Sequence, residues 1–310
     1  MDRSTMAQLF ARFPISMRYV LGVLLISAYS FDARILKDYI DGKLATKFNY
    51  SNEAIAKIKS LENRYFGDRC FILGNGPSLN QTDLSYLKNE VSIASSGIFH
   101  LFKENNYRPT YYTVVDFIFA QQYAKIIDRV IQSDNITGIL LNSLKKYIQG
   151  DDSTIWVNFL PTWVHGHYSQ YTQENMEMNR ENPLLPEFSE DLVRGIHDAG
   201  TVTYVNLQLA LYMGFKEIYL IGVDHNYHIE KTIQTHDEDI LISDYEVDPN
   251  HFSPNYTPKG HKMAVPRVSI MESAYYKARK VAESQGVNIY DATKGGHLRV
   301  YQKVDYDSLF

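Results

Sequence analysis

The feature that most constrains the fold is a short apolar segment that ends in two closely spaced glycines. Residues 69–73 read Arg-Cys-Phe-Ile-Leu, and Gly74, Asn75, Gly76, Pro77 and Ser78 follow directly. A short apolar run that stops at glycine and proline predicts a buried β-strand turning into a loop. Glycine permits positive φ and close backbone approach, and consecutive N–H groups at a helix start bind anions. We interpret this turn, including the Ser78 hydroxyl, as a nucleotide-phosphate site; the alternative is a simple tight turn.

The remaining chain alternates between strand-like and helix-like segments, which predicts a mostly parallel sheet with helices on both faces. Its length of 310 residues and hydrophobic content of 45% are enough for one large core plus a small accessory region. The expected strands are residues 91–94, 111–116, 136–141, 217–223 and 287–290. The expected helices are residues 119–131, 204–213 and 269–285.

Residues 1–66 are expected to form a separate, mostly helical region, with one helix beginning at Ser51 or Asn52. The apolar run 19–29 follows several arginines and is shorter than the roughly 20 residues of a membrane span. Two alternatives remain for it: a buried amphipathic helix, or a helix that lies on an anionic membrane surface. Residues 67–310 would form the nucleotide-binding domain, with lid-like insertions at about 151–190 and 228–260. The first insertion is aperiodic, and we expect it to cover the site.

Charge and cysteine content exclude several classes of function. The net charge is −5, and no long lysine or arginine run occurs, which argues against a nucleic-acid-binding protein. A single cysteine, Cys70, excludes an intramolecular disulfide and any multi-cysteine zinc site. A reducing, cytoplasmic location fits this composition.

Polar residues that follow the expected strands are the candidates for chemistry, because ligands in parallel sheets bind beyond the carboxyl ends of the strands. Asp116 could meet a ribose hydroxyl or a metal ion, or could cap a helix. Asp224 opens a dense polar group, and a metal site would require Asp116, Asp224 and a histidine to converge. His261 lies in a flexible polar loop and could act as a general base.

Three segments resemble known families. Residues 71–79 (Phe-Ile-Leu-Gly-Asn-Gly-Pro-Ser-Leu) and residues 213–224 are similar to bacterial sialyltransferases of glycosyltransferase family 42 and to the related 6-hydroxymethylpterin pyrophosphokinase MptE-like family. Residues 288–298 resemble the MptE-like branch found in surface-polysaccharide loci. The resemblance covers about residues 66–310. It implies a Rossmann-like fold, a variant of the GT-A fold, and an inverting transfer from a CMP-sugar without an obligatory metal.

The resemblance also implies roles for individual residues. His261, in Gly260-His261, matches the family's histidine base, and residues 74–78 would hold the donor phosphate and cytidine. Other positions depart from the sialyltransferase pattern. Ser95 or Ser96, and Asp116, stand where the family has donor-binding asparagines; Asn226 stands where it has a phosphate-binding tyrosine, with Tyr227 or Tyr245 as substitutes; and residues 197–201, ending in Thr201, lack its acceptor-binding arginine.

We therefore expect a glycosyltransferase that moves a sialic-acid-like or other acidic sugar from a CMP donor to a surface-glycan or lipid-linked acceptor, with His261, Asp224 and Tyr227 as catalytic residues. Peripheral contact with the cytoplasmic face of the inner membrane and a homo-oligomer are compatible with the sequence. One alternative is an ATP-dependent pyrophosphokinase acting on a hydroxymethyl group, with Mg²⁺ held by Asp116 and Asp224. The other is a non-catalytic nucleotide-binding assembly factor.

Overall fold

The fold is built on a single large parallel sheet. The computed structural model describes residues 50–103, 106–132, 136–160, 187–236 and 240–310. Its main sheet has eight strands in the order β13-β12-β8-β1-β2-β3-β4-β5, and all neighbouring pairs are parallel. The strands are β1 (Arg69–Leu73), β2 (Val91–Ser95), β3 (Tyr111–Val114), β4 (Thr137–Leu141), β5 (Ile155–Val157), β8 (Glu217–Ile221), β12 (Asn288–Asp291) and β13 (Gln302–Lys303).

The strand order reverses between β1 and β8, in the middle of the sheet. From β1 the chain progresses outward to β5, and from β8 it progresses in the opposite direction to β13. The two central strands are paired in register, with Leu73 opposite Ile221, so they end at the same level. This reversal is a topological switch point, where the loops of open α/β sheets part and ligands bind.

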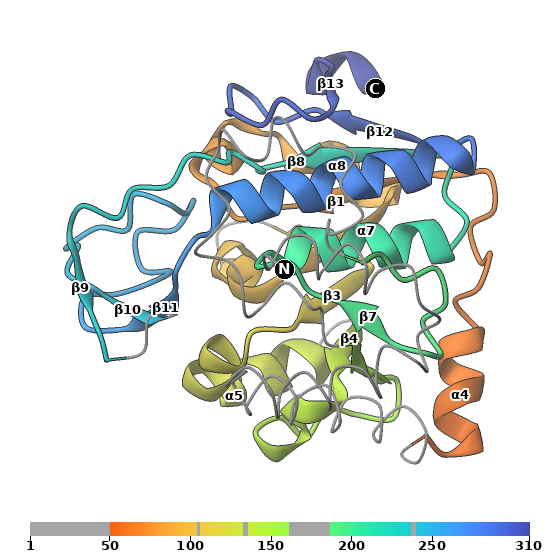
Figure 1. Ribbon diagram of the computed structural model, residues 1–310, viewed down its shortest axis with the longest axis horizontal. Helices are drawn as coiled ribbons and strands as arrows, with labels where there is room; N and C mark the ends of the chain where they lie inside the picture. The colour runs from red at the N-terminus through yellow and green to blue at the C-terminus, as the bar shows by residue number, and fades with distance from the viewer. Residues whose placement is uncertain (1–49, 104–105, 133–135, 161–186, 237–239) are drawn as a thin grey trace, which may run out of the picture.

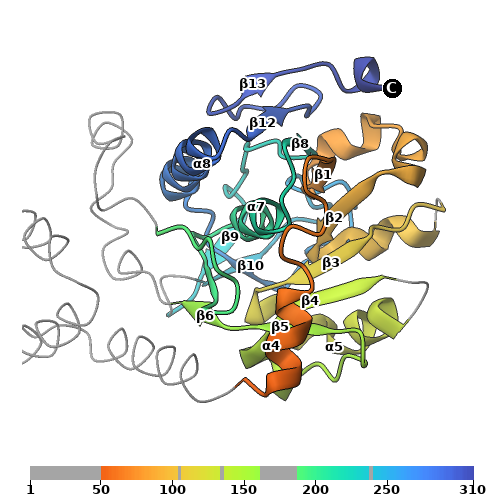
Figure 2. The ribbon, with the colours of Figure 1, turned by 90° about the vertical axis from the view of Figure 1, so that its right-hand side faces the viewer.

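Helical segments cover both faces of the sheet (Figures 1 and 2), as the sequence predicts. Right-handed crossovers place connections made in opposite directions on opposite faces. One face carries α7 (Val202–Tyr212) and α8 (Val268–Ser284), and α7 is buried from residue 203 to 212 because it packs against the sheet and α8. The other face carries α5 (Phe117–Gln132) and the 3₁₀ segments η1 (Pro77–Gln81), η2 (Leu84–Asn89) and η3 (Ser96–Lys103).

The N-terminal described segment packs on the main sheet. Helix α4 (Asn52–Lys59) begins after Ser51, whose hydroxyl accepts a hydrogen bond from the Ala54 N–H at 3.1 Å, as expected of a helix cap. The helix contacts β5, and Lys57 donates to the Asp152 carbonyl at 2.8 Å. The apolar run 19–29 lies outside the described residues. In the part of the chain that the structure describes, helices are all too short or too polar to cross a bilayer.

The two expected insertions contain more regular structure than the sequence predicts. Residues 155–157 form edge strand β5 of the main sheet, and β6 (Phe159–Leu160) pairs with β7 (Ile196–His197). Residues 161–186 lie outside the described residues. The segment from 228 onward contributes β9 (Thr232–Gln234) and β10 (Ile240–Ser243), which join β11 (Lys262–Ala264) in an antiparallel sheet. These strands are too short to display a period in sequence. The structure also contains the 3₁₀ segments η4 (Asn142–Lys146) and η7 (Tyr306–Leu309).

Candidate functional site

The turns that follow β1 and β8 are pressed against each other at the switch point. The Gly74 N–H donates to the Ile221 carbonyl at 2.8 Å, and the Gly76 N–H donates to the Gly222 carbonyl at 2.9 Å. A β-carbon on Gly74 would lie 2.3 Å from the Gly222 oxygen, and one on Gly76 would lie 1.9 Å from Asp224 Oδ2. Close approach is therefore the reason for both glycines, as the sequence predicts. Neither Gly74 nor Gly76 uses the positive φ that glycine permits.

Ser78 and Asp224 join the same two turns through side chains. The Ser78 hydroxyl donates to Asp224 Oδ2 at 2.7 Å, and the Ser78 N–H donates to Oδ1 at 3.2 Å. Burial raises the pKa of Asp224, opposed by these two hydrogen bonds and reinforced by the charge of Asp291. The N–H groups of Gly74, Gly76 and Ser78 are thus all bonded within the protein. The prediction that they form an open cradle for a phosphate is wrong for this structure, because the turn after β8 takes up their hydrogen bonds.

Asn75 is the member of the turn whose hydrogen bonding is incomplete. Its Nδ2 donates to the Ser95 carbonyl at 3.1 Å, at the end of β2. Its Oδ1 is buried and has no hydrogen-bond partner among the described residues, and the same holds for the Ser95 hydroxyl. A buried polar atom without a partner costs about 1–3 kcal/mol. Two such atoms on contacting residues therefore mark a place where a polar ligand could bind.

A loop of residues 244–261, between β10 and β11, covers this turn. The Phe252 N–H donates to the Asn75 carbonyl at 2.9 Å, and Asn80 Nδ2 donates to the Phe252 carbonyl at 2.8 Å. The Tyr256 hydroxyl accepts from the Gly97 N–H at 3.1 Å, just beyond β2. This loop belongs to the second of the two lid-like insertions.

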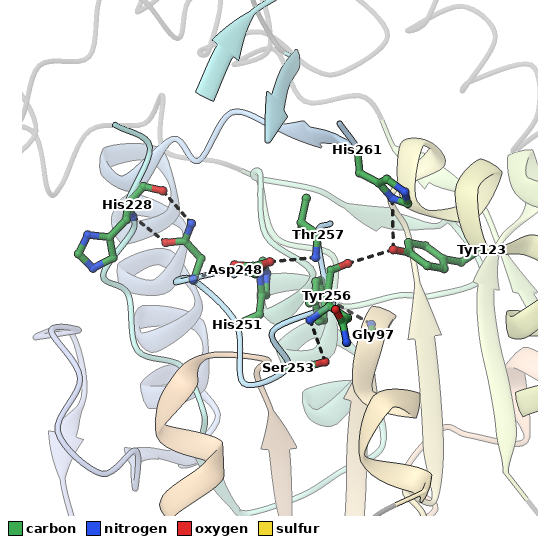
Figure 3. A network of polar contacts seen from close by, with 11 residues as sticks. Gly97, Tyr123, His228, Asp248, His251, Ser253, Tyr256, Thr257 and His261 are labelled. Atoms are coloured by element: carbon green, nitrogen blue, oxygen red, sulfur yellow. Dashed lines mark hydrogen bonds and ion pairs between the residues drawn. The ribbon is translucent and has the colours of Figure 1, made fainter. Parts of the chain in front are cut away.

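Inside this loop, an aspartate, a histidine and a tyrosine form one cluster (Figure 3). His251 Nδ1 lies 2.8 Å from Asp248 Oδ2, and the His251 ring stacks on Tyr256 with centroids 3.7 Å apart. The sequence gives one clue to this cluster, the spacing of Asp248 and His251 by three residues in a polar segment. Their partner Tyr256 could not be recognised without the fold.

Comparison with known proteins identifies the family. A family model described as 6-hydroxymethylpterin diphosphokinase MptE-like matches residues 44–230, which is more than half of the chain. The chain belongs to the MptE-like family. No curated protein matches. Among solved structures, a MAf glycosyltransferase from Magnetospirillum magneticum AMB-1 is similar over 83% of this chain, with a TM-score of 0.44 and 11% identity. The MptE-like chain covers 38% of that structure.

Three of the residues that the sequence assigns to nucleotide binding have structural roles in this MptE-like protein. Asp116 accepts from the N–H groups of Ile118 at 2.7 Å and Phe119 at 3.3 Å, so it caps α5. Burial raises its pKa, against the effect of these bonds. Thr201 caps α7 in the same manner through the Thr203 N–H. Ser96 adopts a left-handed conformation, with φ of 50°, where η3 begins.

The polar residues after β8 separate into buried and exposed groups. Asn226 is exposed, whereas Tyr227 packs against the core and burial raises its pKa. His225 is buried, with φ of 54° and both ring nitrogens outside hydrogen-bond geometry with described residues. Its Nε2 lies 3.5 Å from Glu272 Oε1 of α8, within ion-pair distance. The sequence does not predict this strained, buried histidine.

Asp116 and Asp224 are the two carboxylates considered for a metal ion. Asp116 accepts hydrogen bonds from the first turn of α5, and Asp224 accepts them from Ser78. The described residues contain no group of three or more His, Cys, Asp or Glu side chains placed to hold a metal ion. His261 is the last residue of the loop of residues 244–261, just before β11, and its Nδ1 lies 3.4 Å from the Tyr123 hydroxyl of α5. The Tyr123 hydroxyl also donates to the Tyr256 carbonyl at 3.1 Å, so Tyr123 connects His261 with Tyr256 of the same loop.

Proposed function

We propose that this MptE-like protein is a glycosyltransferase that binds a CMP-activated acidic sugar at the switch point and transfers the sugar to a glycan or lipid-linked acceptor. The observation that carries the proposal is the pair of unpaired, buried polar atoms, Asn75 Oδ1 and Ser95 Oγ, at the ends of β1 and β2. The resemblance of residues 71–79 to family 42 sialyltransferases supports CMP as the nucleotide.

An amide oxygen and a hydroxyl suit the nucleoside better than the phosphate. The amide oxygen can only accept a hydrogen bond, so it suits a donor such as an exocyclic amine or a ribose hydroxyl of the nucleoside. The serine hydroxyl can both donate and accept a hydrogen bond. A buried polar group of this kind selects strongly for the ligand that completes its hydrogen bonds. Because the amides of Gly74, Gly76 and Ser78 are already bonded, we assign the nucleoside, not the phosphate, to this turn.

Nucleotide binding requires the loop of residues 244–261 to move. Ser95 is fully buried, and Phe252 and Tyr256 of this loop bond to Asn75 and Gly97 beside it. Loops that close over a substrate exclude water from the reaction and commonly carry catalytic groups. The loop is therefore assigned both to cover the donor and to contribute to the chemistry.

The family's description favours a second candidate, an ATP-dependent diphosphokinase. That reaction needs Mg²⁺ bridging the phosphates, bound by one or two carboxylates. Asp116 and Asp224, which follow β3 and β8, are the carboxylates that the sequence assigns to Mg²⁺. Each already accepts hydrogen bonds, and burial raises the pKa of both. This environment disfavours the charged form that a metal ion needs, so we rank this candidate second.

A thermal-shift screen tests the two candidates. CMP, CDP, UDP, GDP and ATP would each be added with and without Mg²⁺. A ligand at 100 times its dissociation constant stabilises the folded state by about 2.7 kcal/mol. Selective stabilisation by CMP without metal supports a CMP-sugar donor, whereas stabilisation by ATP only with Mg²⁺ would overturn it in favour of the diphosphokinase.

Ser95→Ala is the matched variant for this screen. The Ser95 hydroxyl is buried and has no partner among the described residues, so its removal should not lower the free energy of unfolding and should raise it by up to about 1–3 kcal/mol. CMP affinity should fall about tenfold, equivalent to one hydrogen bond of about 1.4 kcal/mol. An unchanged CMP affinity would remove Ser95 from the site.

A further measurement distinguishes an enzyme from a non-catalytic nucleotide-binding protein. An enzyme should release CMP from a CMP-sugar in the presence of acceptor, and a binding protein should not.

A further inference from the structure

The carboxylate of Asp248 is fixed by hydrogen bonds from its own loop. Its side chain is 3% exposed, and its oxygens accept from the Asn250 N–H at 2.8 Å and the Thr257 N–H at 2.9 Å. Burial opposes ionisation, but the hydrogen bond from His251 and these amides outweigh it and lower the pKa of Asp248. The carboxylate therefore stays charged and points at the imidazole of His251.

The imidazole of His251 is held on two sides and open on a third. Nδ1 lies 2.8 Å from Asp248 Oδ2, and the ring lies flat on Tyr256 with an interplanar angle of 3°. Gly97 makes room for Tyr256, because a β-carbon there would lie 2.1 Å from the tyrosine ring. The side chain of His251 is 22% exposed, and Nε2 makes no hydrogen bond to a described residue. A carboxylate at Nδ1 selects the tautomer whose Nε2 lone pair is free.

This imidazole lies beside the candidate donor site. Phe252, the next residue, donates its N–H to the Asn75 carbonyl. Tyr256, against which the ring stacks, bonds to Gly97, two residues beyond Ser95. Asp248, Asn250 and Thr257 belong to the same loop as His251. The pair therefore keeps its internal hydrogen bonds when the loop moves as a unit.

His261, the base that the family resemblance implies, lacks such support. Its ring contact is the Tyr123 hydroxyl at 3.4 Å, and no described carboxylate lies within ion-pair distance of it (Figure 3). Orientation by a second group is what distinguishes a base of the Asp–His type from an isolated histidine.

We propose that His251, oriented by Asp248, is the general base of the transfer reaction. This inference rests on the proposed function. As the acceptor oxygen forms a bond to the anomeric carbon, the bond between that carbon and the CMP phosphate oxygen breaks, and its electron pair leaves with CMP. The acceptor hydroxyl proton passes to His251 Nε2, and the Asp248 carboxylate stabilises the resulting imidazolium. His251 is a catalytic residue and Asp248 a positioning residue.

The charged and titratable groups around His251 determine the electrostatic environment of its imidazole. Asp248 lies on its own loop, and Tyr256 lies against the ring. On the Tyr256 side are His100 of η3, with ring centroids 6.0 Å apart, and the charge of Asp116. Burial raises the pKa of Tyr256, so the phenol stays neutral near pH 7. Tyr256 therefore adds no negative charge beside His251 at this pH.

The test compares His251→Ala, His251→Gln and Asp248→Asn with the wild-type chain. Initial rates of CMP release would be measured from a CMP-activated acidic sugar with acceptor. Both His251 variants should lose about 10²–10⁴-fold in kcat with little change in donor KM. Added imidazole should restore part of the His251→Ala activity, which a merely structural role would not allow. Asp248→Asn should lose less activity and should change the pH profile of kcat/KM, because the charge that stabilises the imidazolium is removed.

Two controls complete the experiment. His236→Ala, at an exposed histidine away from this loop, should retain the wild-type kcat. The loss in His251→Ala should exceed that in His261→Ala by at least tenfold. A wild-type kcat in His251→Gln, with normal stabilisation by CMP, would overturn the assignment of His251 but not the proposed function. A loss of kcat confined to His261→Ala would have the same meaning. Failure of the wild-type chain to bind CMP would instead overturn the proposed function.

Discussion

At the scale of single residues, the turn after β1 tolerates no side chain at Gly76. A β-carbon there would lie 1.9 Å from Asp224 Oδ2 and 2.9 Å from the Gly222 oxygen, so two fixed turns would have to separate. We expect Gly76→Ala to lower the free energy of unfolding by about 1–3 kcal/mol, measured by urea denaturation. Loss of nucleotide binding in this variant would therefore report on folding as well as on the site.

Gly138→Ala is the matched control for Gly76→Ala. Gly138 lies in β4 without a positive φ, and its β-carbon would meet only side-chain atoms of Ile131, at 3.1–3.5 Å. A flexible side chain can give way by a few tenths of an ångström, so a smaller loss is expected. Equal losses in the two variants would show that the two turns at the switch point separate easily.

Asp116 gives a prediction about pH. Its folded-state pKa is raised by burial, so the stability it contributes is present below the unfolded-state value of about 3.9 and is lost as pH rises through the folded-state pKa. Asn also caps helices but cannot ionise. The stability of Asp116→Asn relative to wild type should therefore increase from pH 3 to pH 7, measured as the difference in thermal midpoint. Asp116→Ala should be less stable than Asp116→Asn by about 1 kcal/mol at both pH values because α5 loses its cap; a pH-independent difference between Asp116→Asn and wild type would contradict the raised pKa.

Sequence patterns located these residues but not their partners. Gly74 and Gly76 are recognisable because a strand pattern stops at them, and helix capping was one of the roles expected of Asp116. The partner of Ser78 could not be predicted, because Asp224 lies in a turn that reaches it only through the pairing of β1 with β8. The unpaired state of Asn75 Oδ1 likewise depends on atoms that only the fold brings near.

At the scale of elements, the loop of residues 244–261 is closed over the candidate site. Under the proposed function, this closed conformation competes with nucleotide binding. Tyr256→Phe removes the hydroxyl that accepts from the Gly97 N–H but keeps the ring on which His251 stacks. The closed state should lose about 0.5–1.5 kcal/mol, and apparent CMP affinity should rise about 2- to 10-fold because less closure must be undone. Calorimetric titration with CMP measures this; weaker CMP binding would mean that the tyrosine hydroxyl contacts the nucleotide or that the closed loop is the binding state.

The main elements were predictable because buried strands and helices carry long, clear patterns. Strand β1 and helix α7 both appear in the sequence as apolar segments bounded by glycine. Edge strand β5 and the small sheet of β9, β10 and β11 were missed. Each has three or four residues, and β9 is largely exposed, so neither hydrophobic alternation nor burial distinguishes them from a loop.

At the scale of the whole molecule, the candidate site results from the order of the strands. The alternation of strands and helices predicts a parallel sheet, but several strand orders satisfy it. The placement of β8 beside β1 brings Asp224 to Ser78, and the end of β2 adds Ser95. Residues from three distant parts of the chain thus meet at one end of the sheet, which explains why local motifs identify the fold class more readily than the site.

Deletion of residues 1–30 tests how the N-terminal region relates to the rest of the molecule. The contacts that hold α4 lie beyond the cut: the Ser51 cap, Lys57 to Asp152, and the packing of α4 on β5. The truncated chain should therefore keep its thermal midpoint and its response to CMP.

If the apolar run 19–29 lies on a membrane surface, the truncated chain should no longer sediment with anionic phospholipid vesicles. A full-length variant with Arg3, Arg12 and Arg18 changed to Ala should bind less strongly while keeping the apolar run, since each basic residue near such a surface contributes about 1 kcal/mol. Aggregation of the truncated chain with loss of the cooperative transition would instead place this run within the folded core, where its removal exposes apolar surface of its neighbours.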